Sequence, residues 1–343
     1  PIVVLRGDDG EVRALHNVCR HRGSIVCDAA AGHAGRRLVC PYHQWSYRLD
    51  GHFAGGRDVA VEVDREALAM GAAHCTTVGG LVFVCVATDP PDPAFLRDLV
   101  EPYLAPFNLD HAVVAHQETV VEHGNWKLVM ENNRECHHCR LAHPELCTTF
   151  PQGTMHSGGG SAEERQRLDE LVAVAEAAGL PSRLAADDRQ QYRVMRMPLE
   201  AGTRSMTLDG APAVDRRFGR LPDLDLGDLL LYHYPSTWNH FMADHAVTFR
   251  MLPLGPTSTE LRTTWLVPPN GAGSTHSDDL DRLTAVWTAT NRQDTALVER
   301  AQRGIASPAY RPGPYAPTDE DGVIQFVDWY VGTLLTRAGK PAR

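Results

Sequence analysis

Two short loops near the start of the chain each contain one cysteine and one histidine. The first, C-R-H, has Cys19 and His21, and the second, C-P-Y-H, has Cys40 and His43. Thiolates and neutral imidazoles bind metals, and four of them complete a centre when they converge on one point. A shared centre requires the chain to turn back between the two loops. This requirement constrains the fold more strongly than any other local pattern.

The ligand set fits two kinds of metal centre. In a Rieske 2Fe–2S cluster, one iron binds two cysteines and the other binds two histidines. A structural zinc site uses the same side-chain types, but zinc fingers generally place both histidines on one helix. Here each loop contributes one cysteine and one histidine, which favours a 2Fe–2S cluster held by Cys19, His21, Cys40 and His43. Zinc is the alternative.

Short segments with the composition of β-strands surround the two loops. Turn signals such as Asp50-Gly51 separate these segments. The density of short strands predicts a small antiparallel β domain. The predicted strands are 2–5, 11–15, 37–40, 45–48, 59–63 and 81–86.

Composition and charge argue against several classes of protein. The 343 residues carry a formal net charge of −10, whereas nucleic-acid binding needs a basic face. No apolar run reaches the ~18–20 residues of a membrane span. The eight cysteines lack the spacing of a secreted disulfide framework, so we expect a cytoplasmic protein. Because Pro1 opens directly into a predicted strand, we also expect that an N-terminal piece is missing.

A second group of candidate ligands lies in residues 125–146, which are predicted to be mostly helical. Glu135, His138 and His143 form a carboxylate-x2-His-x4-His run. Glu135 and His138 are three residues apart and share a helix face. His143 is rotated by about 500° from His138, so convergence of the imidazoles requires a break or a local widening of the helix near 139–142. The alternative is a pair of surface histidines before a helix end.

The third ligand of such a site is expected to be a carboxylate. Two imidazoles and one carboxylate on one side of a metal form the site of non-haem Fe(II) oxygenases. Asp294 falls on the apolar stripe of a predicted helix at 280–304, where a charge is costly unless it is paired or bound to a metal. We therefore predict Asp294 as the ligand. The stripe comprises Leu283, Val286, Thr290, Leu297 and Ala301, and Asp278, Asp279, Asp281 and Glu299 are interpreted as capping or solvated charges.

Proline and acidic residues are concentrated in residues 88–112, as is typical of a linker between domains. We therefore predict three parts: a 2Fe–2S domain at 1–88, a linker at 89–115 and a catalytic mononuclear iron domain at 116–343. A strand predicted at 113–121 leads into the helical run that holds the second group of candidate ligands.

One helix in the middle of the chain has clear start and stop signals. Ser161-x-x-Glu164 predicts a capping box, in which each side chain bonds to the other residue's backbone. The helix is expected to run through Ala178 and to end at Gly179.

Three longer stretches resemble the α subunits of Rieske non-haem iron oxygenases, over nearly the whole chain. The stretches are NWKLVMENNRECHHC with HPELC, YHYPSTWNHFMADHAVTFRMLP, and TNRQDTALVERAQRGIASPAYRPGPY with GVIQFVDWY. The most similar subgroup acts on quaternary ammonium compounds, and includes glycine betaine monooxygenase, stachydrine (proline betaine) demethylase and carnitine oxygenase. Tyr42 and Ser24 stand where respiratory-chain Rieske proteins have further cysteines, which also favours the oxygenase branch.

The resemblance implies an α+β fold. A small antiparallel β Rieske domain would be followed by a larger helix-grip catalytic domain, an antiparallel sheet around a long C-terminal helix. It implies that His138, His143 and Asp294 bind the mononuclear iron. Glu135 would be the carboxylate that joins this iron site to a cluster histidine of a neighbouring subunit in a homotrimer.

The resemblance also implies a reaction. NAD(P)H would supply electrons through a ferredoxin or flavin-containing reductase partner, and O2 would be the co-substrate. Hydroxylation of an N-methyl group of a cationic substrate would give a carbinolamine, which collapses to formaldehyde and a tertiary amine. The sequence departs from the subgroup at two places. His137 replaces the aromatic residue usual before the first iron histidine, which leaves two adjacent imidazoles, and 268–277 lacks the acidic pattern expected of a glycine betaine enzyme, which bears on the substrate.

Aromatic side chains are the expected ligands of a quaternary ammonium group, because it cannot donate a hydrogen bond. Two alternatives remain open. The first is an aromatic-ring or alicyclic C–H hydroxylase or dioxygenase on the same scaffold. The second is a non-catalytic Rieske electron-transfer protein or zinc-stabilised binding protein, against which the second metal site argues. The aromatic candidates are Tyr232 and Tyr234 on one face of a strand, Trp238 and Phe241, with Trp265 and Trp287 elsewhere.

Overall fold

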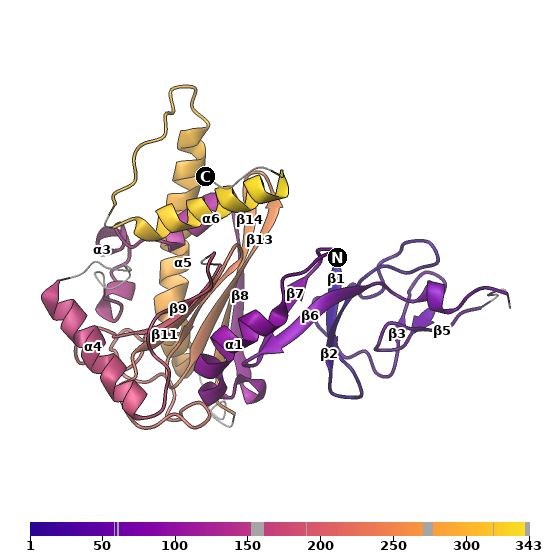
Figure 1. The fold of residues 1–343 in the computed structure, drawn as a ribbon, viewed down its shortest axis with the longest axis horizontal. Helices are drawn as coiled ribbons and strands as arrows, with labels where there is room; N and C mark the ends of the chain where they lie inside the picture. The colour runs from indigo at the N-terminus through magenta and orange to yellow at the C-terminus, as the bar shows by residue number, and fades with distance from the viewer. Residues whose placement is uncertain are drawn as a thin grey trace. The chain divides into compact units, whose positions relative to one another are not determined.

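Two compact units make up the chain, Pro1–Asp98 and Leu99–Arg343 (Figure 1). Antiparallel sheets form the framework of both units, which confirms the expected α+β class. The computed structural model describes residues 1–57, 59, 62–151, 161–189, 191–269, 277–317 and 319–339.

The first unit contains a four-stranded sheet of order β1-β2-β6-β7 and a three-stranded sheet of order β3-β4-β5. β5 and β6 were not predicted. The predicted strand 59–63 is wrong for Val59, Glu62 and Val63, which lie outside any strand, while 60 and 61 lie outside the described residues. The strands are β1 Ile2–Arg6, β2 Val12–His16, β3 Leu38–Val39, β4 Ser46–Tyr47, β5 Phe53–Gly55, β6 Ala72–Val78 and β7 Leu81–Cys85, with a 3-10 turn η1 at Glu66–Leu68.

The hydrophobic core of the first unit includes the cysteines of both ligand loops. Cys19 and Cys40 are buried in one cluster with Leu15, Leu38 and Tyr47. Leu15 and Leu38 come from the strands that precede the two loops. Packing of these strands therefore brings the loops together.

A helix occupies much of the segment that was predicted to be a linker. α1 spans Pro93–Leu104, and its first residue is a proline, whose missing N–H is unneeded at that position. Two 3-10 turns follow, η2 at Ala105–Phe107 and η3 at Leu109–His111. Of the prolines that indicated a linker, Pro93 starts the helix, Pro102 lies within it and Pro106 lies in the turn after it. The limits 1–88, 89–115 and 116–343 remain predictions.

The second unit is built on a seven-stranded antiparallel sheet of order β8-β14-β13-β12-β11-β10-β9. Along β14, partly buried and buried residues alternate strictly, as expected when the two faces of a strand meet different surroundings. The predicted strand at 113–121 corresponds to β8. The strands are β8 Val113–Glu122, β9 Ala185–Ala186, β10 Tyr192–Met197, β11 Asp228–His233, β12 Thr237–Phe241, β13 Ala246–Gly255 and β14 Ser258–Val267.

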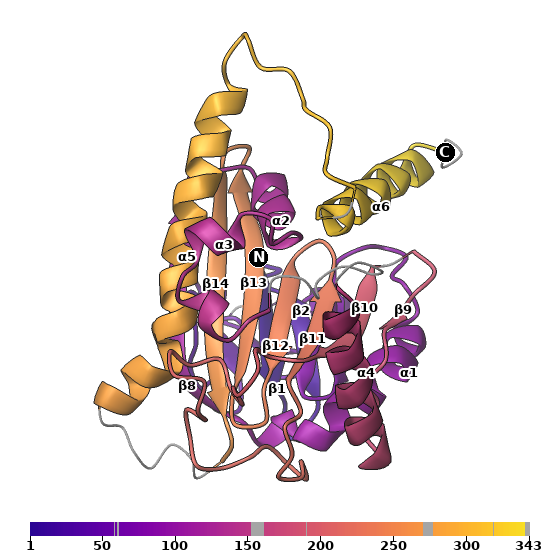
Figure 2. The same ribbon diagram turned by 90° about the vertical axis from the view of Figure 1, so that its left-hand side faces the viewer.

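Helices cover this sheet, and the longest, α5, packs against α2 and β8 (Figure 2). Gly124, before α2, lies so close to α5 that a Cβ atom there would be 2.4 Å from Cγ1 of Val298. This contact holds α5, which carries Asp294, against α2, which precedes the turn that contains Glu135 and His138. The helices are α2 Trp126–Asn133, α3 Cys139–Ala142, α4 Ala162–Ala177, α5 Ser277–Ile305 and α6 Asp321–Arg337, with a 3-10 turn η4 at Leu146–Thr148.

The predicted apolar stripe of α5 is partly wrong. Leu283, Val286 and Thr290 are buried, but Ala301 is exposed and Val298 is buried instead. A period of 3.6 residues shifts the buried face along a helix this long, so the stripe drifts away from simple three- and four-residue steps. Among the described residues no helix is long and apolar enough to cross a membrane.

The start of α4 follows the predicted pattern. Ser161 accepts a hydrogen bond from Glu164 N, and the Glu164 carboxylate accepts one from Ser161 N. The helix ends at Ala177, and Gly179 takes the left-handed conformation that lets the chain turn away.

Candidate metal centres

The two loops of the first unit have the same backbone hydrogen-bond pattern. Cys19 N donates to Ser24 O and Gly23 N donates to Cys19 O, at 2.8 and 3.0 Å. In the second loop, the same bonds link Cys40 N to the carbonyl five residues on, and the N–H four residues on back to Cys40 O, again at 2.8 and 3.0 Å. Gly23 and Gln44 both have positive φ and close these turns. The loops therefore present their ligands as an equivalent pair.

The cysteines of the two loops lie inside and the histidines outside. Cys19 and Cys40 are buried, whereas His21 and His43 are exposed, with ring centroids 4.6 Å apart. Burial raises the pKa of Cys40, but hydrogen bonds from Tyr42 and other groups around its sulfur outweigh burial and lower it. A thiolate is the metal-binding form of cysteine, so this environment suits a metal ligand.

Tyr47 contacts the first of these cysteines from the core. Its hydroxyl lies 3.2 Å from Cys19 Sγ and accepts a hydrogen bond from Arg20 N at 2.9 Å. Burial, followed by the hydrogen bond with Cys19, raises the pKa of Tyr47, which keeps the hydroxyl protonated. Tyr47 can therefore donate its proton to a metal-bound sulfur.

In the second unit, the helical run of residues 125–146 is interrupted. We placed the break near 139–142, but α2 already ends at Asn133, and Cys139–Ala142 forms the short helix α3. Glu135 and His138 therefore lie in the turn between two helices and not on one helix. The turn rather than helix periodicity aims both imidazoles at one point.

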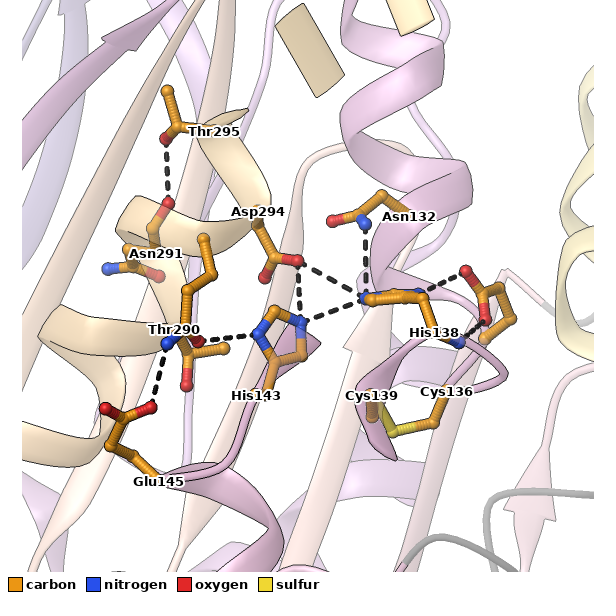
Figure 3. A network of polar contacts seen from close by, with 12 residues as sticks. Asn132, Cys136, His138, Cys139, His143, Glu145, Thr290, Asn291, Asp294 and Thr295 are labelled. Atoms are coloured by element: carbon orange, nitrogen blue, oxygen red, sulfur yellow. Dashed lines mark hydrogen bonds and ion pairs between the residues drawn. A yellow bond between two sulfur atoms is a disulfide. The ribbon is translucent and has the colours of Figure 1, made fainter. Parts of the chain in front are cut away.

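Three ligand atoms from two elements converge there (Figure 3). His138 Nε2 and His143 Nε2 are 3.0 Å apart, and Asp294 Oδ1 lies 3.4 and 2.9 Å from them. Ligands on one face of an octahedron with bonds of ~2.1 Å are ~3.0 Å apart. Asp294 Oδ1 is also buried and makes no well-aligned hydrogen bond to any described residue. The geometry thus fits three protein ligands around one cation.

Further side chains orient these ligands through the other ring nitrogens. Glu135 Oε1 lies 2.5 Å from His138 Nδ1, and Gln293 Oε1 lies 2.8 Å from His143 Nδ1. Such partners fix the tautomer that leaves Nε2 for a metal. Gln293 was not predicted, although its place next to Asp294 on α5 was a usable signal. Asn132, 3.3 Å from His138 Nε2, was missed as well.

Electrostatics at this cluster favour a bound cation. Burial lowers the pKa of His138, but Asp294 and Glu135 outweigh it and raise the value to about 9. Asp294 shifts the pKa of His143 upward in the same way, and burial of Asp294 is outweighed by the two histidines, which lower its pKa. The site therefore favours a positive charge. Protons on the imidazoles supply this charge when no metal is bound, and a bound metal ion would supply it in their place.

Two cysteines flank His138 and form a disulfide, Cys136–Cys139. This disulfide was not predicted from the sequence. Cys139 Sγ lies within 4.8 Å of the ligand atoms of His138 and His143. Because its sulfur is bonded to Cys136, the carboxylate of Asp294 is the better third ligand.

The structure does not bring the four aromatic candidates into one group. Tyr232 and Trp238 are direct cross-strand neighbours on one sheet face. Phe241 lies on the opposite face and packs on Phe107, because it is an odd number of residues from Trp238. Tyr234 follows β11 and contacts Trp329 of α6.

Two other aromatic residues from the sequence analysis are also buried. Trp287 of α5 packs on Phe249 and His240, beside Trp238. Trp265 lies against His116 in the same hydrophobic core, and among the described residues no ring contact joins it to that group. Phe249 and His240, which were not predicted, therefore complete an aromatic cluster with Trp238 and Trp287.

Comparison with known families accounts for both centres. Residues 1–63 match the Rieske [2Fe-2S] domain, and residues 109–335 match the catalytic domain of the ring-hydroxylating α subunit. The chain belongs to the Rieske non-haem iron oxygenase family. Members of this family are oxidoreductases that carry a 2Fe–2S cluster and a mononuclear iron, as the sequence predicted.

Related proteins place the chain near one branch of the family. It is 44% identical over 98% of its length to the glycine betaine monooxygenase oxygenase subunit of Chromohalobacter salexigens, covering 76% of that protein. The Pseudomonas aeruginosa subunit of the same name is 40% identical over 99% of this chain and 79% of its own. The fold matches the crystal structure of the quaternary ammonium Rieske monooxygenase CntA with a TM-score of 0.69 and 19% identity, over 97% of this chain and 81% of that one.

Proposed function

We propose that this oxygenase hydroxylates an N-methyl group of a quaternary ammonium compound of the glycine betaine or proline betaine type. The unstable product would release formaldehyde and leave a tertiary amine. The observation that carries the proposal is the full-length similarity to two glycine betaine monooxygenase subunits, at 40 and 44% identity. The three convergent ligand atoms and the paired loops support catalysis over a purely electron-carrying role.

The residues of the two centres have separate tasks in this proposal. His138, His143 and Asp294 hold the mononuclear iron, and the cysteines and histidines of the two loops hold the cluster. When bound, these groups supply the electrons and the O2 activation that C–H hydroxylation requires. The chain itself binds and orients the substrate, fixes the ligand tautomers and excludes water.

Glu135 is proposed to connect the two kinds of centre between subunits. Its carboxylate already hydrogen-bonds His138 and is itself only partly buried. In a homotrimer it would face a cluster histidine, His21 or His43, of a neighbouring chain. A flavin-containing or ferredoxin reductase is the proposed electron donor, with NAD(P)H as the source.

The ammonium group is proposed to bind near Trp238. Trp238 and Trp287 lie in one aromatic cluster on the sheet face that α5 covers. Aromatic faces attract a cation that cannot form hydrogen bonds. Tyr232 and Tyr234, also predicted for this role, have the guanidinium of Arg134 over their rings at 4.3 and 5.5 Å. Their ring faces are thus already engaged with a cation of the protein.

The test is a reconstituted assay with a Rieske reductase, NADH and O2. Glycine betaine and proline betaine are expected to yield formaldehyde and the tertiary amine in equal amounts. Naphthalene serves as the competing substrate for a ring hydroxylase. Turnover of naphthalene without turnover of any betaine, by protein that contains both metal centres, would contradict the proposal.

A further inference from the structure

Two arginines are buried on the inner face of the catalytic sheet. Arg134, at the end of α2, is 6% exposed, and Arg193, on β10, is 8% exposed. Neither guanidinium forms an ion pair with a carboxylate among the described residues. Buried charges in proteins are normally paired, so two unpaired guanidinium groups side by side need an explanation.

A single neutral oxygen stands between the two cations. Gln325 Oε1, from α6, accepts hydrogen bonds from Arg134 Nη2 at 3.0 Å and from Arg193 Nη1 at 2.5 Å. The Nε atoms of both arginines have no hydrogen-bond partner in the described part of the chain. Burial, and then the positive charge of Arg134, lowers the pKa of Arg193. The site therefore has donors and positive charge in excess of its acceptors.

Arg196, three residues further along β10, is a useful contrast. It is also buried, but its Nη1 donates to Leu226 O at 2.9 Å and the buried carboxylate of Asp228 lies near enough to favour its charge. Arg196 thus has an acidic partner from the protein. Among the described residues, the pair Arg134 and Arg193 has no carboxylate of comparable burial, and Asp321, which favours the charge of Arg193, is only partly buried.

Open space adjoins the pair on two sides. A cavity of about 20 Å³, enough for one oxygen-sized group, is lined by both arginines and Tyr232. A wider groove of about 590 Å³ is lined by Arg193 and Gln325, together with Trp329 and other residues of α6. Arg193 lines both spaces, so its guanidinium can be reached from the groove, whose lining also includes the carboxylates of Asp321 and Asp328.

The arginine pair is built into the same structural unit as the iron ligands. Arg134 immediately precedes Glu135, which hydrogen-bonds His138. Its Cα atom is four residues from that of His138, which limits their separation to about 14 Å. Tyr232 beside the pair is also the cross-strand neighbour of Trp238. One sheet face thus offers an aromatic cluster and, next to it, a cationic site.

We propose that Arg134 and Arg193 bind the carboxylate of a zwitterionic substrate, with a carboxylate oxygen taking the place that Gln325 Oε1 now occupies. This assignment rests on the proposed function and makes the site selective for betaines over quaternary ammonium alcohols. Each arginine contributes charge-assisted hydrogen bonds, and the aromatic cluster receives the ammonium end.

The test compares Arg193→Gln and Arg193→Lys with wild type in the reconstituted enzyme. Arg193→Gln is expected to raise KM for glycine betaine by about 10- to 100-fold, the effect of losing a charge-assisted hydrogen bond, with kcat changed less. Arg193→Lys is expected to recover part of the loss. Arg183→Gln, an exposed arginine before β9, is the control and should leave KM unchanged.

A second probe keeps the test valid if turnover is weak. 3,3-Dimethylbutyrate carries the carboxylate of glycine betaine on an uncharged tail. It is expected to bind wild type by calorimetry and to lose binding in Arg193→Gln, while tetramethylammonium binds both proteins equally. Equal binding of the carboxylate probe to wild type and variant, or an unchanged KM in folded, iron-loaded Arg193→Gln, would overturn the assignment. Absence of formaldehyde from every betaine in wild type would instead contradict the proposed function.

Discussion

Metal binding at the second centre depends on single side chains, and the role of Asp294 can be tested most directly. Among the described residues, its Oδ1 is the one anionic atom within 3.4 Å of both ligand imidazoles. We predict that Asp294→Asn lowers the iron content from about three to about two per chain and leaves the Rieske EPR signal intact. Metal analysis checks this, with Asp281→Asn on the exposed side of α5 as control. Retention of the third iron would exclude Asp294 as a ligand.

Tyr47 is predicted to tune the cluster. A hydrogen bond to a ligand sulfur stabilises the reduced, more negative state and so raises the reduction potential. Tyr47→Phe removes the hydroxyl that lies 3.2 Å from Cys19 Sγ. A loss of about 1 kcal/mol corresponds to a fall of ~40 mV for one electron, which a redox titration would detect. Tyr42→Phe, in the exposed part of the second loop, should not shift the potential.

Glu122 is predicted to make stability depend on pH. It is buried at the end of β8, and burial, then the charges of Asp294 and Glu299, raises its pKa from 4.5 to about 8. The folded protein keeps this proton while the unfolded chain loses it, so the stability tied to it falls as pH rises from about 4.5 to about 8. When the pH rises from 5.5 to 8, the free energy of unfolding of Glu122→Gln should increase by up to about 3 kcal/mol relative to that of wild type.

Denaturant unfolding at both pH values measures this gain. Glu163→Gln, an exposed position in the first turn of α4, is the control and should follow wild type. An equal effect of Glu122→Gln at both pH values would show that the carboxylate is ionised in the folded state.

At the scale of elements, the start of α6 is held against the turn that follows α2. A Cβ atom on Gly322 would lie 2.3 Å from Arg134 O, so only glycine permits this approach. This contact positions Gln325 between the two arginines. α6 therefore belongs to the same packed group as α2, although about 190 residues separate Arg134 from Gln325.

Gly322→Ala is accordingly predicted to destabilise the protein. The added methyl group must displace α6 from the carbonyl of Arg134, at a cost of about 1–3 kcal/mol. Gly332→Ala lies on the same helix, where a Cβ atom meets nothing within 4 Å. It should be neutral or stabilising by up to about 1 kcal/mol. Equal melting temperatures of the two variants would refute the close contact.

At the scale of the whole molecule, the proposed electron path requires more than one chain. Cys40→Ser chains lack a cluster ligand and Asp294→Asn chains lack an iron ligand, so each variant alone should be inactive. Co-expressed in one assembly, they are predicted to regain roughly a quarter of wild-type turnover, because a random cyclic mixture pairs intact centres at one interface in four. Formaldehyde release from purified mixed assemblies is the measurement. No recovery would place the path within one chain.

Much of the fold and of the two centres could be predicted from local patterns. The cysteine–histidine loops, the capping box of α4 and the pair His138 and His143 are short-range features, and the long helix α5 has a strong periodic signal. Asp294 could be found because a charge on a buried helix face needs a partner. The predictions failed where the local sequence pattern is ambiguous. The proline-rich segment was predicted to be a linker but forms α1, and strands β5 and β6 were not predicted.

Tertiary structure alone decided which distant side chains meet. The break after Asn133, and not helix periodicity, directs His138 toward Asp294. Sheet register puts Arg193 beside Tyr232, and Tyr232 beside Trp238. Packing of α6 then brings Gln325 between Arg193 and Arg134. The amino-acid sequence by itself determined the ligand types and their local spacing, because these depend on neighbouring residues. The pairing of strands and the packing of helices determined which distant side chains come into contact, because such contacts have no signature in the local sequence.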